Sequence, residues 1–142
     1  MIYMKRLIFI AYLILVFPHN SFGHEYNFGN LLIDHPKIIK NANTAKGYMI
    51  ITNLSESDLF LIGGESSFSE ELILHEKNDT ALTSMQKINQ IKIPAGSTIS
   101  FKDSNYHLMF LNYNKTMEWF EPHKAKLFFS NNTHLEVEFD LN

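Results

Sequence analysis

A histidine and a methionine separated by one residue, His107 and Met109, form the first pattern in this sequence that could do chemistry. They belong to a run of aromatic and aliphatic residues that predicts a β-strand. Alternate strand residues share a face, so the imidazole and the thioether lie side by side, about 7 Å apart. We expect His107 and Met109 to lie on the less buried face of this strand, and Tyr106, Leu108 and Phe110 to face the core. Both ligand types suit copper, Cu(I) above all, better than Mg²⁺ or Ca²⁺.

Two more residues of the same kinds, His75 and Met85, precede this pair in the chain. Two neutral imidazoles and two thioethers would bind Cu(I) without adding charge and would discriminate against hard cations. The sequence contains no cysteine, so neither a thiolate site nor a disulfide can form. Taken one by one, a histidine at a strand end is more often a surface residue, and a methionine more often fills a gap in the core. The residue types alone therefore leave both interpretations open.

The elements expected around these residues are short strands. Runs rich in β-branched and aromatic residues, separated by turn residues, predict strands at 47–53, 59–63, 72–75, 88–93, 98–102, 106–111, 125–129 and 135–141. No amphipathic helix is predicted, and this pattern is typical of an all-β, antiparallel Greek-key β-sandwich of about 7–9 strands. Residues 24–30 predict a loose N-terminal arm. Residues 37–44, which follow Pro36, predict a loop.

The first 23 residues have the layout of a secretory signal peptide. Lys5 and Arg6 precede an apolar run at 7–17, and Ser21 and Gly23 place small residues at a cleavage site. The apolar run is shorter than the roughly 20 residues that span a bilayer, so we expect no stable membrane insertion after cleavage. No cysteine follows, which excludes a lipid-anchored form. Residues 24–142 are therefore expected to be one exported domain.

Composition and motifs argue against several classes of protein. The formal net charge is −3 and no run of Lys or Arg is present, so nucleic-acid binding is not expected. No Ser/His/Asp set, Gly-rich phosphate loop or HExxH motif is found, so no enzyme of those classes is expected. An alternative Cu(II) centre could use His24 as a new N-terminus, together with His35, His123 or His134. The last two histidines lie in polar segments, where we expect solvent exposure.

Several motifs, in order, resemble the PCuAC family of periplasmic copper chaperones. The signature of that family is a His and a Met, 21 intervening residues, and then His-x-Met; 21 residues also separate Met85 from His107. The resemblance extends from about residue 43 to residue 141. It departs from the family at Ser104 and Asn105, which replace a usual glycine pair. Further matching motifs are Ala45-Lys46-Gly47-Tyr48-Met49, Ile51-Thr52-Asn53, Ile93-Pro94-Ala95-Gly96 and Leu127-Phe128-Phe129.

The resemblance implies a cupredoxin-like fold and a site in which His75, Met85, His107 and Met109 hold one Cu(I). It also implies a periplasmic chaperone without enzymatic activity, expected to be a monomer. Such a chaperone would deliver copper to an accepting protein, such as the CuA-containing subunit II of cytochrome c oxidase or a thiol-based copper chaperone. Two alternatives stay open, a copper-buffering or tolerance protein with the same site and a metal-free secreted β-sandwich that mediates protein contacts.

Overall fold

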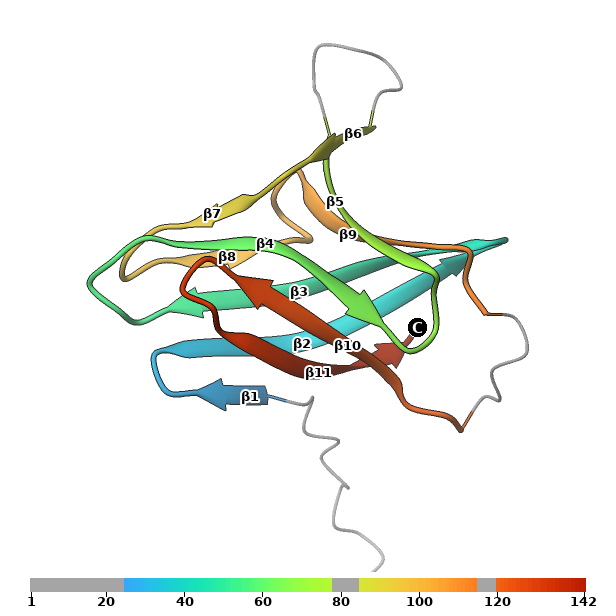
Figure 1. Ribbon diagram of the computed structural model, residues 1–142, viewed down its shortest axis with the longest axis horizontal. Helices are drawn as coiled ribbons and strands as arrows, with labels where there is room; N and C mark the ends of the chain where they lie inside the picture. Colours follow the sequence, from blue (N-terminus) through green and yellow to red (C-terminus); the bar gives the residue numbers. More distant parts are fainter. Residues whose placement is uncertain (1–24, 78–84, 115–119) are drawn as a thin grey trace, which may run out of the picture.

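A computed structural model describes residues 25–77, 85–114 and 120–142 of the chain (Figure 1). The predicted signal peptide and His24 lie outside the described residues. Every regular element in the described part is a β-strand, which confirms the all-β class. The strands are β1 (Glu25–Phe28), β2 (Leu31–Asn41), β3 (Thr44–Asn53), β4 (Leu59–Ser66), β5 (Glu71–Lys77), β6 (Met85–Ile88), β7 (Ile91–Ile93), β8 (Thr98–Ser100), β9 (Tyr106–Leu111), β10 (His123–Phe129) and β11 (His134–Leu141).

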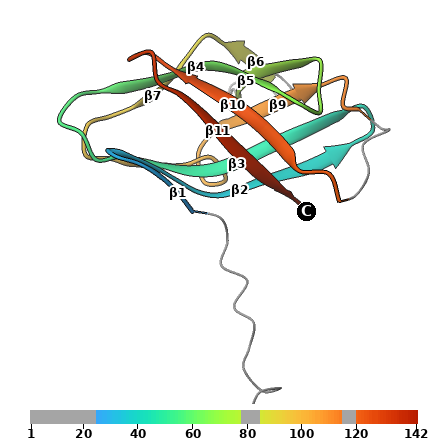
Figure 2. The same ribbon diagram turned by 60° about the horizontal axis from the view of Figure 1, so that its bottom comes forward.

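Seven of these strands form a closed, flattened ring. Its order is β2–β11–β10–β4–β5–β9–β3, and β3 pairs with β2 to close it. The pairs are antiparallel except for β2 with β11, which is parallel. Figure 2 shows the flattened cross-section, with β4 and β5 along one side and β2 and β3 along the other. The predicted Greek-key sandwich is thus confirmed, and β1, β6, β7 and β8 extend it as short additional strands.

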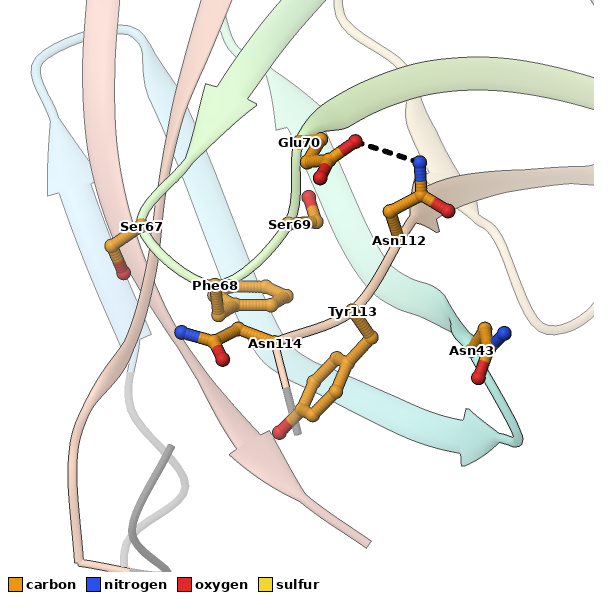
Figure 3. A pocket seen from close by; sticks show the side chains of 8 residues that line it. All are labelled: Asn43, Ser67, Phe68, Ser69, Glu70, Asn112, Tyr113 and Asn114. Atoms are coloured by element: carbon orange, nitrogen blue, oxygen red, sulfur yellow. Dashed lines mark hydrogen bonds between the residues drawn. The ribbon is translucent and has the colours of Figure 1, made fainter. Parts of the chain in front are cut away.

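Side chains inside the ring form a single apolar core. In β3 every second residue from Ala45 to Asn53 is buried, as the period of two along a strand requires. Phe68, which is fully buried, packs on Phe110 with ring centroids 4.6 Å apart and on Tyr113 at 5.8 Å. Figure 3 shows the side chains of Phe68 and Tyr113. With no cysteine in the chain, this packing supplies most of the free energy of folding.

The loop predicted at 37–44 is wrong, because β2 continues to Asn41. The register of β2 against β3 shifts between Asp34 and Lys37, and His35 has a positive φ of +48°. Such a bulge takes Pro36, which has no N–H, out of the hydrogen-bonded ladder, and the strand then resumes. The proline therefore marks an irregularity within a strand and not its end.

The loose arm predicted at 24–30 is also wrong for its described residues. Residues Glu25–Phe28 form β1, which pairs with β2. The Tyr26 hydroxyl accepts a hydrogen bond from the backbone N–H of Glu138 at 3.0 Å. The rings of Tyr26 and Phe28 stack 6.0 Å apart against the core. These contacts fix the segment to the outside of β2 and β11.

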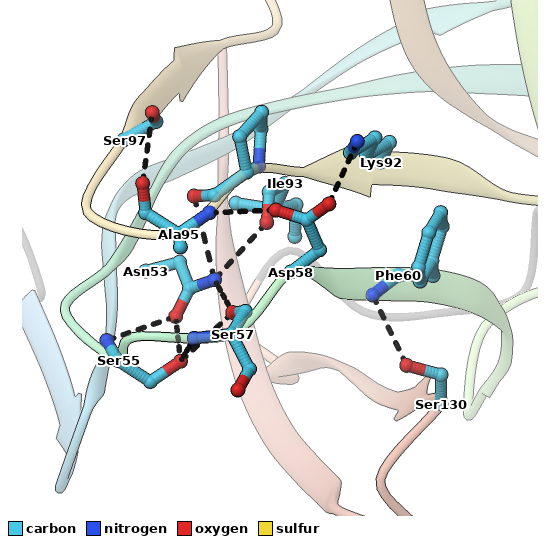
Figure 4. Close-up of polar contacts among 11 residues, drawn as sticks. Asn53, Ser55, Ser57, Asp58, Phe60, Lys92, Ile93, Ala95, Ser97 and Ser130 are labelled. Atoms are coloured by element: carbon cyan, nitrogen blue, oxygen red, sulfur yellow. Dashed lines mark hydrogen bonds and ion pairs between the residues drawn. The ribbon is translucent and has the colours of Figure 1, made fainter.

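A buried amide fixes the loops at one end of the ring (Figure 4). The side chain of Asn53 is 1% exposed, and its Nδ2 donates to the carbonyl oxygens of Ser57 at 2.8 Å and Ile93 at 3.0 Å. Its Oδ1 accepts hydrogen bonds from the backbone N–H and the hydroxyl of Ser55. Asn53 therefore ties the β3–β4 loop to the turn that follows β7, and the motif noted in the sequence has a structural role.

Candidate metal centre

His75 on β5 and His107 on β9 are direct cross-strand partners. Figure 1 shows these two strands side by side. Their ring centroids lie 5.3 Å apart, and the ring planes are nearly perpendicular, at 87°. Residues paired in this way place their side chains on the same face of the sheet. Leu74 and Leu108, the neighbouring pair, point into the core. The two imidazoles therefore lie together on the outer face of the ring.

Each of these imidazoles has a buried nitrogen without a hydrogen-bond partner among the described residues. The atoms are Nδ1 of His75 and Nε2 of His107. A buried polar atom without a partner costs free energy, and native proteins usually satisfy such atoms. A neutral imidazole nitrogen with a free lone pair is also a metal ligand. The pair of unsatisfied nitrogens on facing histidines thus fits a bound metal ion.

Both histidines are held in the neutral form that binds metals. Burial, together with smaller effects of the charges of His75 and Lys46, lowers the pKa of the His107 imidazole to about 4. Burial likewise lowers the pKa of His75, with additional effects of Lys46 and Lys87. Near neutral pH neither ring needs to lose a proton before it can coordinate a cation.

Met109 lies on the same face as His107, because it is two residues further along β9. It is half-buried, and its cross-strand partners are Ile73 on β5 and Lys46 on β3. Met85 is the first residue of β6, and its backbone pairs with that of Lys77 on β5. The Met85 side chain lies outside the described part of the structure. The fold therefore brings all four predicted residues onto the adjacent strands β6, β5 and β9.

The face of His107 and Met109 is the outer one, as expected, and Leu108 and Phe110 on the other face are fully buried. Met109 is half-buried, but His107 itself is more buried than expected, since only 4% of this residue is exposed. The ring of Tyr48 on β3 lies 6.3 Å from that of His107, and His75 packs against its other side. Side chains of neighbouring strands thus cover the imidazole, although it points away from the core. Lys46 and Tyr48 also lie around this imidazole; the sequence indicated them only as members of a matching motif and assigned them no role at the site. In β3 these two residues alternate with buried ones, and this alternation is the signal that puts them on the outer face.

The other histidines lie on different strands. His35 on β2 is exposed, and its Nδ1 is 2.6 Å from an oxygen of Asp34. His134 begins β11 and is exposed, as expected. The expected exposure of His123 is wrong: it lies in β10, is 4% exposed and hydrogen-bonds through Nε2 to the Tyr113 hydroxyl at 2.5 Å. The described residues include no cluster of three or more His, Asp or Glu side chains that could hold a metal ion.

A polar pocket of about 530 Å³ opens at the other end of the β5–β9 pair (Figure 3). Glu70 and Asn112 form part of its wall, and a hydrogen bond of 2.7 Å joins Glu70 Oε2 to Asn112 Nδ2. The nearest strand pair, Glu71 with Leu111, is four residues along each strand from the two histidines. The pocket is thus separate from the candidate metal centre.

The described part of the chain has no helix long and apolar enough to cross a membrane.

Comparison with known proteins identifies the family. Residues 31–141 match the family described as "Putative lipoprotein LpqE-like", and the chain belongs to this family. No curated protein matches. The 142 residues of the sequence include no cysteine that could carry a thiol-linked lipid.

Solved structures of PCuAC domains share the fold. The copper-bound PCuAC domain from PmoF2 superposes with a TM-score of 0.70 at 19% identity, over 84% of this chain and 97% of that domain. The apo PCuAC domain from PmoF1 gives 0.70 at 18% identity, over 84% and 98%. The solution structure of CuI-DR1885 from Deinococcus radiodurans gives 0.63 at 15% identity, over 84% and 80%. The resemblance to PCuAC domains inferred from the sequence is thereby confirmed.

Proposed function

We propose that this protein is a copper metallochaperone that binds one Cu(I) through His75, Met85, His107 and Met109. The observation that supports this most directly is the facing pair His75 and His107, each with a buried nitrogen that has no partner among the described residues. Met109 adds a thioether on the same face. The donor set, two imidazoles and two thioethers, has the softness that Cu(I) prefers. The similar structures include a copper-bound PCuAC domain and CuI-DR1885, which agrees with this metal.

The proposed ligands suit transfer of the ion as well as its capture. Thioethers remain ligands in an oxidising compartment, where a pair of thiols would form a disulfide. They are also weaker donors than a deprotonated thiolate, so an acceptor with thiolates can withdraw the ion by ligand exchange. The chain's own contribution is to hold neutral imidazoles on rigid strands and to keep Met109 beside them. No chemical reaction beyond ligand exchange is needed, and we propose no enzymatic activity.

We place this chaperone in the periplasm. The proposed organisation is a signal peptide at 1–23 and a copper-chaperone domain at 24–142, which is consistent with the leader-like pattern of the first residues. The proposed acceptor is a copper protein such as the CuA-containing subunit of cytochrome c oxidase or a thiol-based chaperone. A periplasmic buffer of copper would use the same site without an acceptor.

Simultaneous replacement of His107 and Met109 by Ala tests the ligand set. We expect anaerobic competition titration to show one Cu(I) bound to the wild-type protein and none to the double variant. His134→Ala on β11 is the matched control, because this exposed histidine is not part of the site; it should bind Cu(I) as the wild type does. Circular dichroism checks that each variant is folded. Stoichiometric binding by a folded double variant would contradict the proposed ligands, and no binding by the wild type would favour a metal-free interaction module.

A further inference from the structure

Several lysines of the ring form ion pairs, on both sides of it. Beside the two histidines, Lys87, the cross-strand partner of His75, lies 3.3 Å from a carboxylate oxygen of Glu71. On β10, Lys124 and Lys126 form ion pairs of 3.2 Å with Glu136 and Glu65. Lys92 on β7 is similarly paired with Asp58 at 2.7 Å. These side chains are exposed, so each pair adds little stability, but it cancels the local charge.

Three lysines near the candidate metal centre have no carboxylate partner within the described residues. They are Lys37 on β2, Lys46 on β3 and Lys102 in the turn after β8. Lys46 pairs across the sheet with Met109, and Lys37 pairs with Tyr48, whose ring contacts that of His107. Three cationic side chains without an ion-pair partner thus lie near the centre in a protein with a formal net charge of −3.

A groove of about 530 Å³ runs beside the centre on the same face. Ile39, Tyr48 and Ile50 are among its apolar lining residues, and Lys37 and Lys102 also line it. The Asp103 carboxylate also lines it and accepts a hydrogen bond of 2.7 Å from the Ser100 hydroxyl. Ile39 is 45% exposed, so a binding partner could still bury apolar area there. Tyr48 belongs both to the groove and to the surroundings of His107.

We propose that this groove is the docking surface for the copper acceptor, and that the acceptor binds it with an acidic segment bearing an apolar side chain. The inference rests on the proposed function. Carboxylates of the partner would face Lys37 and Lys102, while its apolar side chain would cover Ile39 and Ile50. Complementary charge of this kind mainly raises the association rate and fixes the orientation. Tyr48 lines the groove and contacts His107. A partner bound in the groove would therefore lie beside the metal centre, where metal-binding side chains of the partner can reach the copper ion.

The test uses copper-free protein and three fluorescent peptides without cysteine. All have the same Leu and Phe residues, and the remaining positions are Asp/Glu, Lys/Arg or Ser/Gln. We expect fluorescence anisotropy at low salt to show that the acidic peptide binds about tenfold more tightly than the basic one. The preference should disappear near about 0.5 M salt, where exposed charges are screened. Vesicles of phosphatidylglycerol serve as a second anionic probe.

Two double variants locate the binding surface. Lys37→Gln with Lys102→Gln should weaken binding of the acidic peptide about fivefold or more. Lys124→Gln with Lys126→Gln changes the net charge equally on the opposite side and should leave binding within about twofold. Equal binding of the acidic and basic peptides, equal losses in both variants, or binding to the vesicles in preference to the acidic peptide would overturn the proposal.

A parallel Cu(I) titration separates this inference from the proposed function. The Lys37/Lys102 variant keeps all four proposed ligands, so its Cu(I) affinity should equal that of the wild type. Wild-type protein that binds the acidic peptide but no Cu(I) would contradict the copper function. Protein that binds Cu(I) but shows no preference for the acidic peptide would contradict the docking surface alone.

Discussion

The burial of His107 makes the stability of the copper-free protein depend on pH. In the folded state the pKa of this imidazole is lowered to about 4, from 6.5 for an unperturbed histidine. Between these values the unfolded chain binds a proton that the folded protein does not, so acid favours unfolding. The stabilising contribution is fully present above pH 6.5 and is lost as the pH falls towards 4.

Urea unfolding of the metal-free protein at several pH values tests this effect. We expect His107 to lower the free energy of unfolding by about 3 kcal/mol between pH 7.5 and pH 4. In His107→Gln this part of the pH dependence should be absent. His134→Gln, at an exposed position, should keep the wild-type dependence. An equal pH dependence in the wild type and His107→Gln would show that this imidazole is not held neutral by the fold.

Tyr113 and His123 form a second buried polar pair. In Tyr113→Phe the Nε2 atom of His123 would lose the hydroxyl that satisfies it. We expect a loss of about 1–3 kcal/mol in the free energy of unfolding, measured with urea at pH 7.5. Tyr48→Phe is the control, because no hydrogen bond to the Tyr48 hydroxyl is found among the described residues; it should change stability by less than about 0.5 kcal/mol. Equal effects of the two substitutions would contradict a specific role for this hydrogen bond.

For single residues, the sequence predicted which side chains could bind a metal but not how deeply each would be buried. The spacing of Met85, His107 and Met109 needed no structure. The burial of His107 depends on Tyr48 and His75, which belong to other strands, and no local pattern shows that contact. The burial of His123 is unpredictable for the same reason, because its partner Tyr113 and the ring of Phe68 come from other segments.

Among the elements, β3 is the one that supports the candidate centre from beside β9. Gly47 faces Leu108 across these strands, and this position has no room for a side chain. A Cβ atom there would lie 2.7 Å from Cε2 of Phe110 and 3.1 Å from Cβ of Leu108. Both neighbours flank Met109 in the sequence. The glycine therefore lets β9 approach β3 closely while its side chains fill the core.

Gly47→Ala should destabilise the protein and weaken its binding of Cu(I). Overpacking in a dense core costs about 1–3 kcal/mol, and the resulting shift of β9 would move the proposed ligands. Gly29→Ala in the β1–β2 turn is the matched control: its φ of +69° makes alanine unfavourable by about 1 kcal/mol, but it contacts nothing near the centre. Urea unfolding and Cu(I) competition measure the two effects. Wild-type copper affinity in Gly47→Ala would contradict this role of β3.

Element boundaries were predictable where the pattern was regular. The strand at 106–111 has the predicted bounds, and β11 begins one residue earlier than expected. The predicted strand at 88–93 is instead divided between β6 and β7, which pair with different strands. Local propensity favours extended backbone throughout that segment, but only tertiary pairing decides where one strand ends and the next begins.

For the whole molecule, alternation and turn spacing predicted the all-β class, whereas the closure of the ring was not predictable. It depends on pairing of β2 with β11, which lie at opposite ends of the domain sequence. Such distant contacts leave no trace in a local pattern. The sheet order matters for the centre, because β9 pairs with β5 on one side and β3 on the other, so that residues from three segments surround His107.

In the proposed site, two histidines and two methionines hold one Cu(I). X-ray absorption of the protein after anaerobic titration with one equivalent of Cu(I) tests it most directly, because sulfur and nitrogen scatterers are distinguished. The proposed ligands predict about two thioether sulfurs and two imidazole nitrogens around the ion. A site with nitrogen scatterers and no sulfur would contradict the proposed ligands.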